Sequence, residues 1–177
     1  MTNGDFASLE EIVDIESHNV DKMAKGLGIL NPWRWQLIRK TSRDNARTPM
    51  QWSAFPGAGF TTGTPWLQIN KNHTTINVEA DRADPEGIFA FYQKAIALKK
   101  ESDVLLYGDF TELYAKGRLY VFAREYEGRK LVAVCSFDKR SRPLPVPVTG
   151  KVLLSSCSGQ TEADAPLRPW EFRLIEL

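Results

Sequence analysis

Residues 43–52 read Arg-Asp-Asn-Ala-Arg-Thr-Pro-Met-Gln-Trp and combine two guanidiniums, a carboxylate, two amides and an indole. The segment has neither helical nor strand periodicity. Arginine donors bind hydroxyls and carboxylates in a fixed fork, so a hydroxyl-rich ligand suits this set of side chains. A polar surface loop is the alternative, but such loops seldom place residues like Met50 and Trp52 beside fixed charges. The segment therefore predicts a ligand-binding loop.

This loop belongs to a longer irregular stretch, residues 41–72, in which glycine and proline recur every few residues. About 30 residues without periodic structure indicate either function or disorder. Disorder is disfavoured because the stretch carries apolar side chains that disordered segments lack. They are Trp52, Phe55, Phe60, Trp66, Leu67 and Ile69. The stretch therefore predicts an ordered functional loop.

One helix follows this stretch. Asp84-Pro85-Glu86 offers an N-cap, a proline in the first turn and an acid beside the helix dipole. The apolar positions that follow at helical spacing predict a helix over roughly 85–101. They are Ile88, Phe91, Tyr92, Ala95, Ile96 and Leu98. A looser apolar stripe within the first 25 residues, with a cap at Ser8, predicts a partly helical start.

After Ser102 the sequence becomes rich in branched and aromatic residues separated by turn pairs. Strands are predicted at 104–107, 110–114, 119–126, 130–137, 152–155 and 172–177, with an edge segment at 141–147. Both faces of residues 119–123 are apolar, which places that strand inside a sheet. Six or seven short strands in about 75 residues favour a small antiparallel β-sandwich.

Composition limits the classes of function. The chain has 177 residues and a formal net charge of +1, which argues against a nucleic-acid or membrane partner. Cys135 and Cys157 are too few for a disulfide framework and are expected to be buried thiols. No metal or cofactor motif is visible, and His18 and His73 stand alone. Without a visible leader or membrane span, the expected location is the cytoplasm.

The two halves of the chain differ in kind. The front half has one clear helix and no strand for that helix to cover, whereas the back half is all β. A helix with an apolar face needs a partner layer. The front half is therefore typical of the end of a larger α/β protein.

The 43–52 segment closely resembles the Arg-Asp-Asn loop of the α-glucosidases of glycoside hydrolase family 13, the oligo-1,6-glucosidase group in particular. Further segments are similar to the same family: Met1–Asn3, Asp5–Asn19, Ala58–Trp66, Ile76–Val78, Asp84–Ser102 and Leu167–Glu171. These enzymes have a (β/α)8 barrel followed by a C-terminal β-sandwich. The resemblance implies an α+β fragment. Residues 1–102 would be the end of the barrel, with its loop and last helix but no barrel sheet, and residues 103–177 an antiparallel β-sandwich domain.

The resemblance also implies an activity. Family members hydrolyse α-glucosidic bonds with retention, using a nucleophile, a general acid and a third carboxylate that stabilises the transition state. By the resemblance all three lie ahead of this chain. No catalytic residue is therefore assigned here, and the isolated chain is expected to be inactive. Its expected partners are a short α-glucosidic oligosaccharide and the missing barrel portion.

The first arginine of the motif contacts glucose in the −1 subsite of relatives, so Arg43 is the predicted substrate-binding residue. A salt bridge that only fixes the loop is the alternative for this side chain. Other members of the motif are expected to support the loop: Asp44, Asn45, Arg47, Gln51 and Trp52. The first two would hold the loop's own backbone. The second arginine would pack or form an ion pair, and the last two would anchor the loop.

Two further interpretations compete with an enzyme fragment. A standalone carbohydrate-binding or structural β-module could stack its aromatic side chains on sugar faces. The candidates are Trp33, Trp35, Trp66 and Trp170. An assembly subunit that completes a barrel supplied by another chain is the third. The choice between α-1,6, α-1,4 and trehalose-phosphate substrates stays open.

Overall fold

The computed structural model describes residues 2–159 and 161–177, and it divides the chain into two units, Met1–Pro85 and Glu86–Leu177. Met1, the first residue of the Met1–Asn3 motif, lies outside the described residues. Each unit has hydrophobic clusters of its own. The expected domain boundary after residue 102 stays a prediction.

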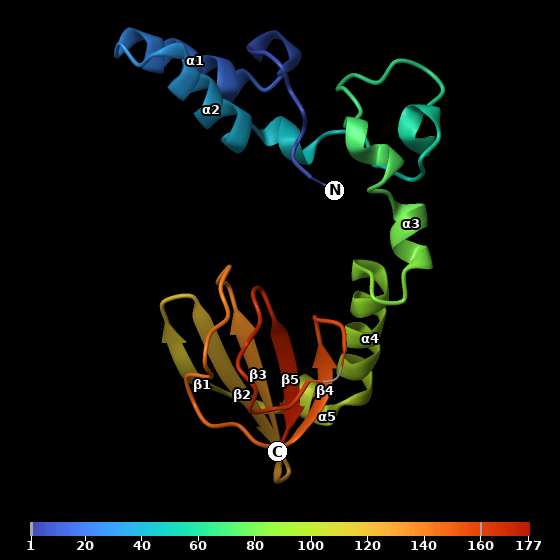
Figure 1. Cartoon of the computed structure of the whole chain (residues 1–177), viewed down its shortest axis with the longest axis vertical. Coiled ribbons are helices and arrows are strands. Elements are labelled where there is room, and N and C mark those ends of the chain that lie inside the picture. Colours follow the sequence, from blue (N-terminus) through green and yellow to red (C-terminus); the bar gives the residue numbers. More distant parts are fainter. Residues whose placement is uncertain (1, 160) are drawn as a thin grey trace. The chain divides into compact units, whose positions relative to one another are not determined.

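The first unit is built from short helices and loops (Figure 1). Its α-helices are α1 (Ile15–Gly26), α2 (Asn31–Thr41) and α3 (Val78–Ala83), and its 3-10 turns are Leu9–Glu11, Arg43–Ala46, Pro56–Gly59 and Lys71–Thr74. Helix α1 ends where Gly28 adopts a left-handed φ of 75°. Helix α2 was not predicted from the sequence. Pro32 lies in the first turn of α2, where a residue needs no partner for its backbone N–H.

A small core holds the long irregular loop in place. Phe6 and Ile12 from the start of the chain, Ile38 from α2 and Leu67 from the loop are each at most 2% exposed. Trp35 and Val20 pack against this cluster. Leu67 therefore ties the irregular stretch 41–72 to this core, and the functional role of the stretch stays a prediction.

The second unit contains α4 (Ile88–Glu101), α5 (Asp103–Tyr107) and, among the described residues, five strands. They are β1 (Asp109–Lys116), β2 (Leu119–Tyr126), β3 (Arg129–Ser136), β4 (Lys151–Ser155) and β5 (Phe172–Glu176). All neighbours are antiparallel, in the order β1-β2-β3-β5-β4. The α+β class is therefore observed with one open sheet, and the predicted sandwich is not confirmed.

Two of the predicted strands are wrong. Residues 104–107 form α5, because the Ser102 side chain accepts a hydrogen bond from the Leu105 N–H and caps a helical turn. The edge segment at 141–147 contributes only one bridge, between Arg142 and Leu167. Prolines in that segment remove ladder donors, so the chain runs there as a loop.

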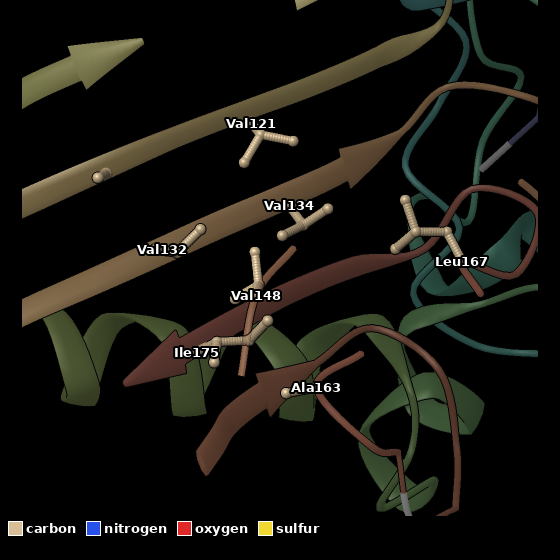
Figure 2. Packing of buried hydrophobic residues seen from close by; sticks show 8 residues of the cluster. Val121, Val132, Val134, Val148, Ala163, Leu167 and Ile175 are labelled. Carbon is tan, nitrogen blue, oxygen red and sulfur yellow. The ribbon is translucent and has the colours of Figure 1, made fainter. Parts of the chain in front are cut away.

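The sheet is apolar on both faces. Along β3, Val132 and Val134 face one cluster, whereas Leu131 and Ala133 face another. Figure 2 shows the first cluster, in which loop residues cover the strands in place of a second sheet. These residues are Val148, Ala163 and Leu167, each at most 6% exposed.

The opposite face is covered by the two helices of this unit. Val104 of α5 is fully buried, Leu98 of α4 packs against the same cluster, and the rings of Phe91 and Phe172 meet edge to face at 6.2 Å. The expectation that the 85–101 helix has no sheet partner in this chain is therefore wrong in part. Tyr92 and Ile96 on its outer side are exposed.

No helix in the described part of the chain is both long and apolar enough to cross a bilayer. Cys135 and Cys157 are free thiols of intermediate exposure, and burial raises the pKa of Cys135.

Candidate functional site

Arg43 is held by a carboxylate that sequence reasoning did not assign to the site. Its Nε and Nη2 donate to Oδ1 of Asp14 at 3.0 and 2.6 Å. Asp14 is 3% exposed, whereas the Arg43 side chain is 59% exposed. The backbone N–H of Arg43 and the hydroxyl of Ser17 donate to the other oxygen, Oδ2, at 3.3 and 2.9 Å. The guanidinium is therefore fixed at one edge and open to solvent at the other.

The charge state of Asp14 follows from these contacts. The hydrogen bond from Arg43 holds the pKa of Asp14 well below its usual range, and this effect exceeds the opposing effect of burial. Asp14 in turn raises the pKa of Arg43. Both groups are ionised at neutral pH, so Asp14 is a fixed anion and cannot donate a proton as a general acid.

Asp44 joins the loop to the start of α1. It is fully buried, and its Oδ2 accepts the backbone N–H groups of Val13 and Asp14 at 2.7 and 3.0 Å. Its Oδ1 forms an ion pair with Arg47. The prediction was that Asp44 holds the loop's own backbone, but these acceptor contacts reach a segment about thirty residues earlier.

Asn45 makes a similar link to the beginning of the chain. Its Oδ1 accepts the backbone N–H of Gly4 at 2.9 Å, and its Nδ2 donates to the carbonyl of Arg39 at 3.0 Å. The segment around Gly4, the end of α2 and the loop therefore meet at this side chain.

Arg47 lies between an acid and an indole. In addition to Asp44 it approaches Oδ1 of Asp14 at 3.8 Å. Its guanidinium carbon lies 5.4 Å from the centre of the Trp66 ring, which is a cation–π distance. Arg47 is therefore ion-paired and packed on an indole, and sequence reasoning missed Trp66 as its neighbour.

Gln51 and Trp52 connect the loop to α3 and to the residues just before it. Gln51 is buried, and its Nε2 donates to Oδ1 of Asn72 and to the carbonyl of Ile76 at 2.8 and 2.6 Å. The backbone carbonyls of Gln51 and Trp52 accept the N–H groups of Val78 and Glu79. The Trp52 side chain itself is half exposed.

A tight left-handed turn supports the backbone of Trp52. Ala58 has a φ of 54° and is fully buried between Gly57 and Gly59, which also have positive φ. Its carbonyl accepts the N–H groups of Trp52 and Ser53 at 2.8 and 3.0 Å. A non-glycine residue in this conformation costs roughly 1 to 2 kcal/mol, so the hydrogen bonds and burial must offset that strain.

The arrangement has limited chemical capability. Within residues 2–159 and 161–177 no group of three His, Cys, Asp or Glu side chains is placed to hold a metal ion. His18 and His73 each pair with a backbone carbonyl, at 2.7 and 3.0 Å. What the loop offers is an oriented cation, Arg43, with donors that can bind oxygen atoms of a ligand.

The sequence contained a partial indication that Asp14 could pair with a loop arginine. Asp14 stands directly before the apolar start of α1, at the N-cap position, although its side chain makes no capping hydrogen bond. Segment 43–52 contains Arg43 and Arg47 but a single acid, Asp44. A second carboxylate is therefore required if both arginines form ion pairs. That imbalance pointed to an acid elsewhere in the chain without identifying which one.

Comparison with known proteins decides the family. The α-amylase catalytic-domain family matches residues 22–108. An oligo-1,6-glucosidase from Halalkalibacterium halodurans is 37% identical over 98% of this chain and 33% of its own length. A glucan 1,6-α-glucosidase from Streptococcus pneumoniae is 35% identical over 100% of this chain and 34% of its own. The chain belongs to the α-amylase family, glycoside hydrolase family 13.

A solved structure agrees with this assignment. Trehalulose synthase from Pseudomonas mesoacidophila superimposes with a TM-score of 0.86 and 31% identity, covering 99% of this chain and 33% of that protein. This member of the α-amylase family therefore spans about one third of the length of the relatives it matches. The likeness extends over both units.

Proposed function

We propose that this chain is the C-terminal part of a retaining exo-α-glucosidase of the oligo-1,6-glucosidase type, acting on short α-glucosidic oligosaccharides. Residues 1–102 are the end of the catalytic barrel, and residues 103–177 are the C-terminal β-domain. The nucleophile and the general acid belong to polypeptide outside these 177 residues. The isolated chain then does not cleave sugar.

The observation that carries this proposal is the exposed guanidinium of Arg43, fixed by two hydrogen bonds to the buried Asp14. A preorganised donor of this kind can bind the hydroxyl oxygen atoms of a sugar. Support comes from family membership and from relatives whose names describe 1,6-glucosidases. A trehalose-6-phosphate hydrolase from Escherichia coli is 36% identical over 81% of this chain, so substrate choice needs measurement.

A chimera tests the proposal. This chain replaces the aligned third of the Halalkalibacterium oligo-1,6-glucosidase, and hydrolysis of isomaltose, maltose and trehalose 6-phosphate is measured. We expect turnover by the chimera, fastest on isomaltose, and none by the 177-residue chain on a chromogenic α-glucoside. Arg43→Gln should lower kcat/KM by up to about 10²-fold, because one charge-assisted hydrogen bond to a sugar hydroxyl is lost.

Arg140→Gln is the matched control, because Arg140 is an exposed arginine of the second unit. It should leave kcat/KM unchanged. Turnover by the isolated chain would show that the reacting carboxylates lie within it. A folded, active chimera that is insensitive to Arg43→Gln would remove Arg43 from the substrate-binding role.

A standalone sugar-binding module is the second candidate, because several indoles are exposed. Trp33, Trp66 and Trp170 are between 59% and 68% exposed, whereas Trp35 packs on the core of the first unit. Exposed indoles can stack on the apolar faces of sugars. Saturable quenching of tryptophan fluorescence by maltose or isomaltose, in the 177-residue chain, favours this function. No change at millimolar sugar favours the enzyme fragment.

A further inference from the structure

The first unit contains a polar cleft that the proposed function does not use. Its volume is about 450 Å³, within the range of small-molecule sites. Arg43 is not among the lining residues. They are Thr2, Asn3, Gly4, Asp5, Arg39, Lys40, Asn70, Lys71 and Asn72.

One wall of this cleft is preorganised by amide hydrogen bonds. Nδ2 of Asn70 donates to Oγ1 of Thr2 and to the carbonyl of Asn3, at 3.1 and 2.7 Å. Nδ2 of Asn72 donates to the same hydroxyl at 2.7 Å, and its Oδ1 accepts from the buried Gln51 at 2.8 Å. Asn70 is 5% exposed. The wall is therefore tied to the buried interior and does not have to order itself when a ligand binds.

The charges around the cleft are unbalanced. Arg39, Lys40 and Lys71 line it, and Asp5 is the only acid among the lining residues. Three cations and one anion leave a net charge of +2. Within the described residues none of these three cations has a carboxylate within ion-pair distance. Unpaired cations around one concave surface raise the local concentration of anions.

We propose that this cleft binds a sugar phosphate. A phosphate monoester carries nearly two negative charges at neutral pH, which matches the net charge of the cleft. Lys40, Lys71 and Arg39 bind the phosphate oxygens, and the Asp5 carboxylate accepts hydrogen bonds from sugar hydroxyls. The volume exceeds that of a phosphate group alone, and an amide and hydroxyl wall suits a hydroxyl-rich body.

Calorimetric titration of the 177-residue chain tests this inference with three probes: glucose 6-phosphate, inorganic phosphate and glucose. Glucose 6-phosphate should bind most tightly, inorganic phosphate more weakly, and glucose not measurably. Binding should weaken steeply between 20 mM and 300 mM salt, because the contacts are charge pairs at a solvated surface. Equal affinity for inorganic phosphate and glucose 6-phosphate would overturn the sugar assignment, and binding of glucose alone would overturn the role of charge.

Substitution then locates the site. Lys40→Ala with Lys71→Ala removes two exposed cations and should weaken glucose 6-phosphate binding about tenfold. The matched control is Lys22→Ala with Lys25→Ala, which removes two exposed lysines of α1 that do not line the cleft. Equal losses in both double variants would mean nonspecific attraction and would sink the proposal. Because none of these variants touches Arg43, the outcome is independent of the chimera experiment.

Discussion

Replacing Asp14 by asparagine tests whether the Arg43 loop is held by this one carboxylate. Asparagine keeps the size of the side chain and one carbonyl oxygen, but it loses the charge and turns one acceptor into a donor. In the structure both oxygens of Asp14 accept from N–H donors: Oδ1 from the guanidinium of Arg43, and Oδ2 from the backbone N–H of Arg43. The variant must therefore break at least one of these contacts.

The size of the effect follows from the contacts. A hydrogen bond to a charged group contributes about 1.5 to 3 kcal/mol, and Arg43 makes two such bonds with its side chain. Because the Arg43 side chain is 59% exposed, water replaces part of what is lost. We expect Asp14→Asn to lower the free energy of unfolding of the first unit by about 2 to 3 kcal/mol.

Urea unfolding followed by tryptophan fluorescence measures this loss. Trp33, Trp35, Trp52 and Trp66 lie in the first unit and Trp170 in the second, so the signal reports mainly on the first. With a slope of about 1 kcal/mol per molar urea for a unit of this size, the midpoint should fall by about 2 to 3 M.

Glu16→Gln supplies the matched control. Glu16 approaches the same guanidinium at 3.6 Å but is 69% exposed, so its removal should cost less than about 0.5 kcal/mol. If Asp14→Asn shifts the midpoint no further than Glu16→Gln, buried hydrogen bonding does not fix the loop and the reasoning about Arg43 fails.

The same variant has a pH signature. The pKa of Asp14 is lowered in the folded state, so its contribution to stability is present above the unfolded pKa, near 3.9, and is lost as the pH falls below it. The wild-type first unit should therefore lose stability between about pH 5 and pH 2, and Asp14→Asn should flatten that part of the curve. An unchanged acid slope would contradict the assignment.

Two further predictions concern the left-handed turn and the second unit. Gly57→Ala should lower the free energy of unfolding by about 1 kcal/mol through backbone strain alone. Gly59→Ala should lower it further, because the new methyl group would lie 2.8 Å from Oγ of Ser53. The urea midpoints of the two variants measure the difference. Burial alone would raise the pKa of Glu171, but hydrogen bonds, led by Arg173, outweigh it and lower it to about 2. Glu171→Gln should therefore destabilise the second unit at pH 7 by about 3 to 5 kcal/mol, because the buried guanidinium of Arg173 loses its counterion. Hydrogen exchange of the second unit should then depend less on pH in the acid range.

The elements that could be predicted are those specified by local patterns. Strand β2 was predicted at 119–126 and is observed there, and β3 differs by one residue at each end. The runs of branched and aromatic residues, and the turn at Glu127 and Gly128, both with positive φ, are properties of the segment itself. The helix predicted at 85–101 begins at Ile88, because Gly87 is its N-cap and Pro85 stays in the preceding turn.

The predicted sandwich is not confirmed, and local patterns could not show this. Val148 and Leu167 reach the core from loops. Buried arginine contacts organise the segment that precedes β5. Arg173 donates to the carbonyls of Ala165 and Pro166 at 2.6 and 2.8 Å, which satisfies backbone groups without a ladder.

In the candidate site, too, local sequence patterns do not show which distant residues pair with each other. The 43–52 motif identified the loop and the arginine, since composition and resemblance are both read from contiguous residues. The carboxylate that orients Arg43 lies 29 positions earlier, and the amide wall of the polar cleft joins Thr2 to Asn70 across 68. Such pairs depend on how α1, α2 and the loop pack, and several acids would satisfy the same charge requirement. The motif therefore predicts Arg43 as the side chain that meets a ligand, while the fold decides that Asp14 orients it.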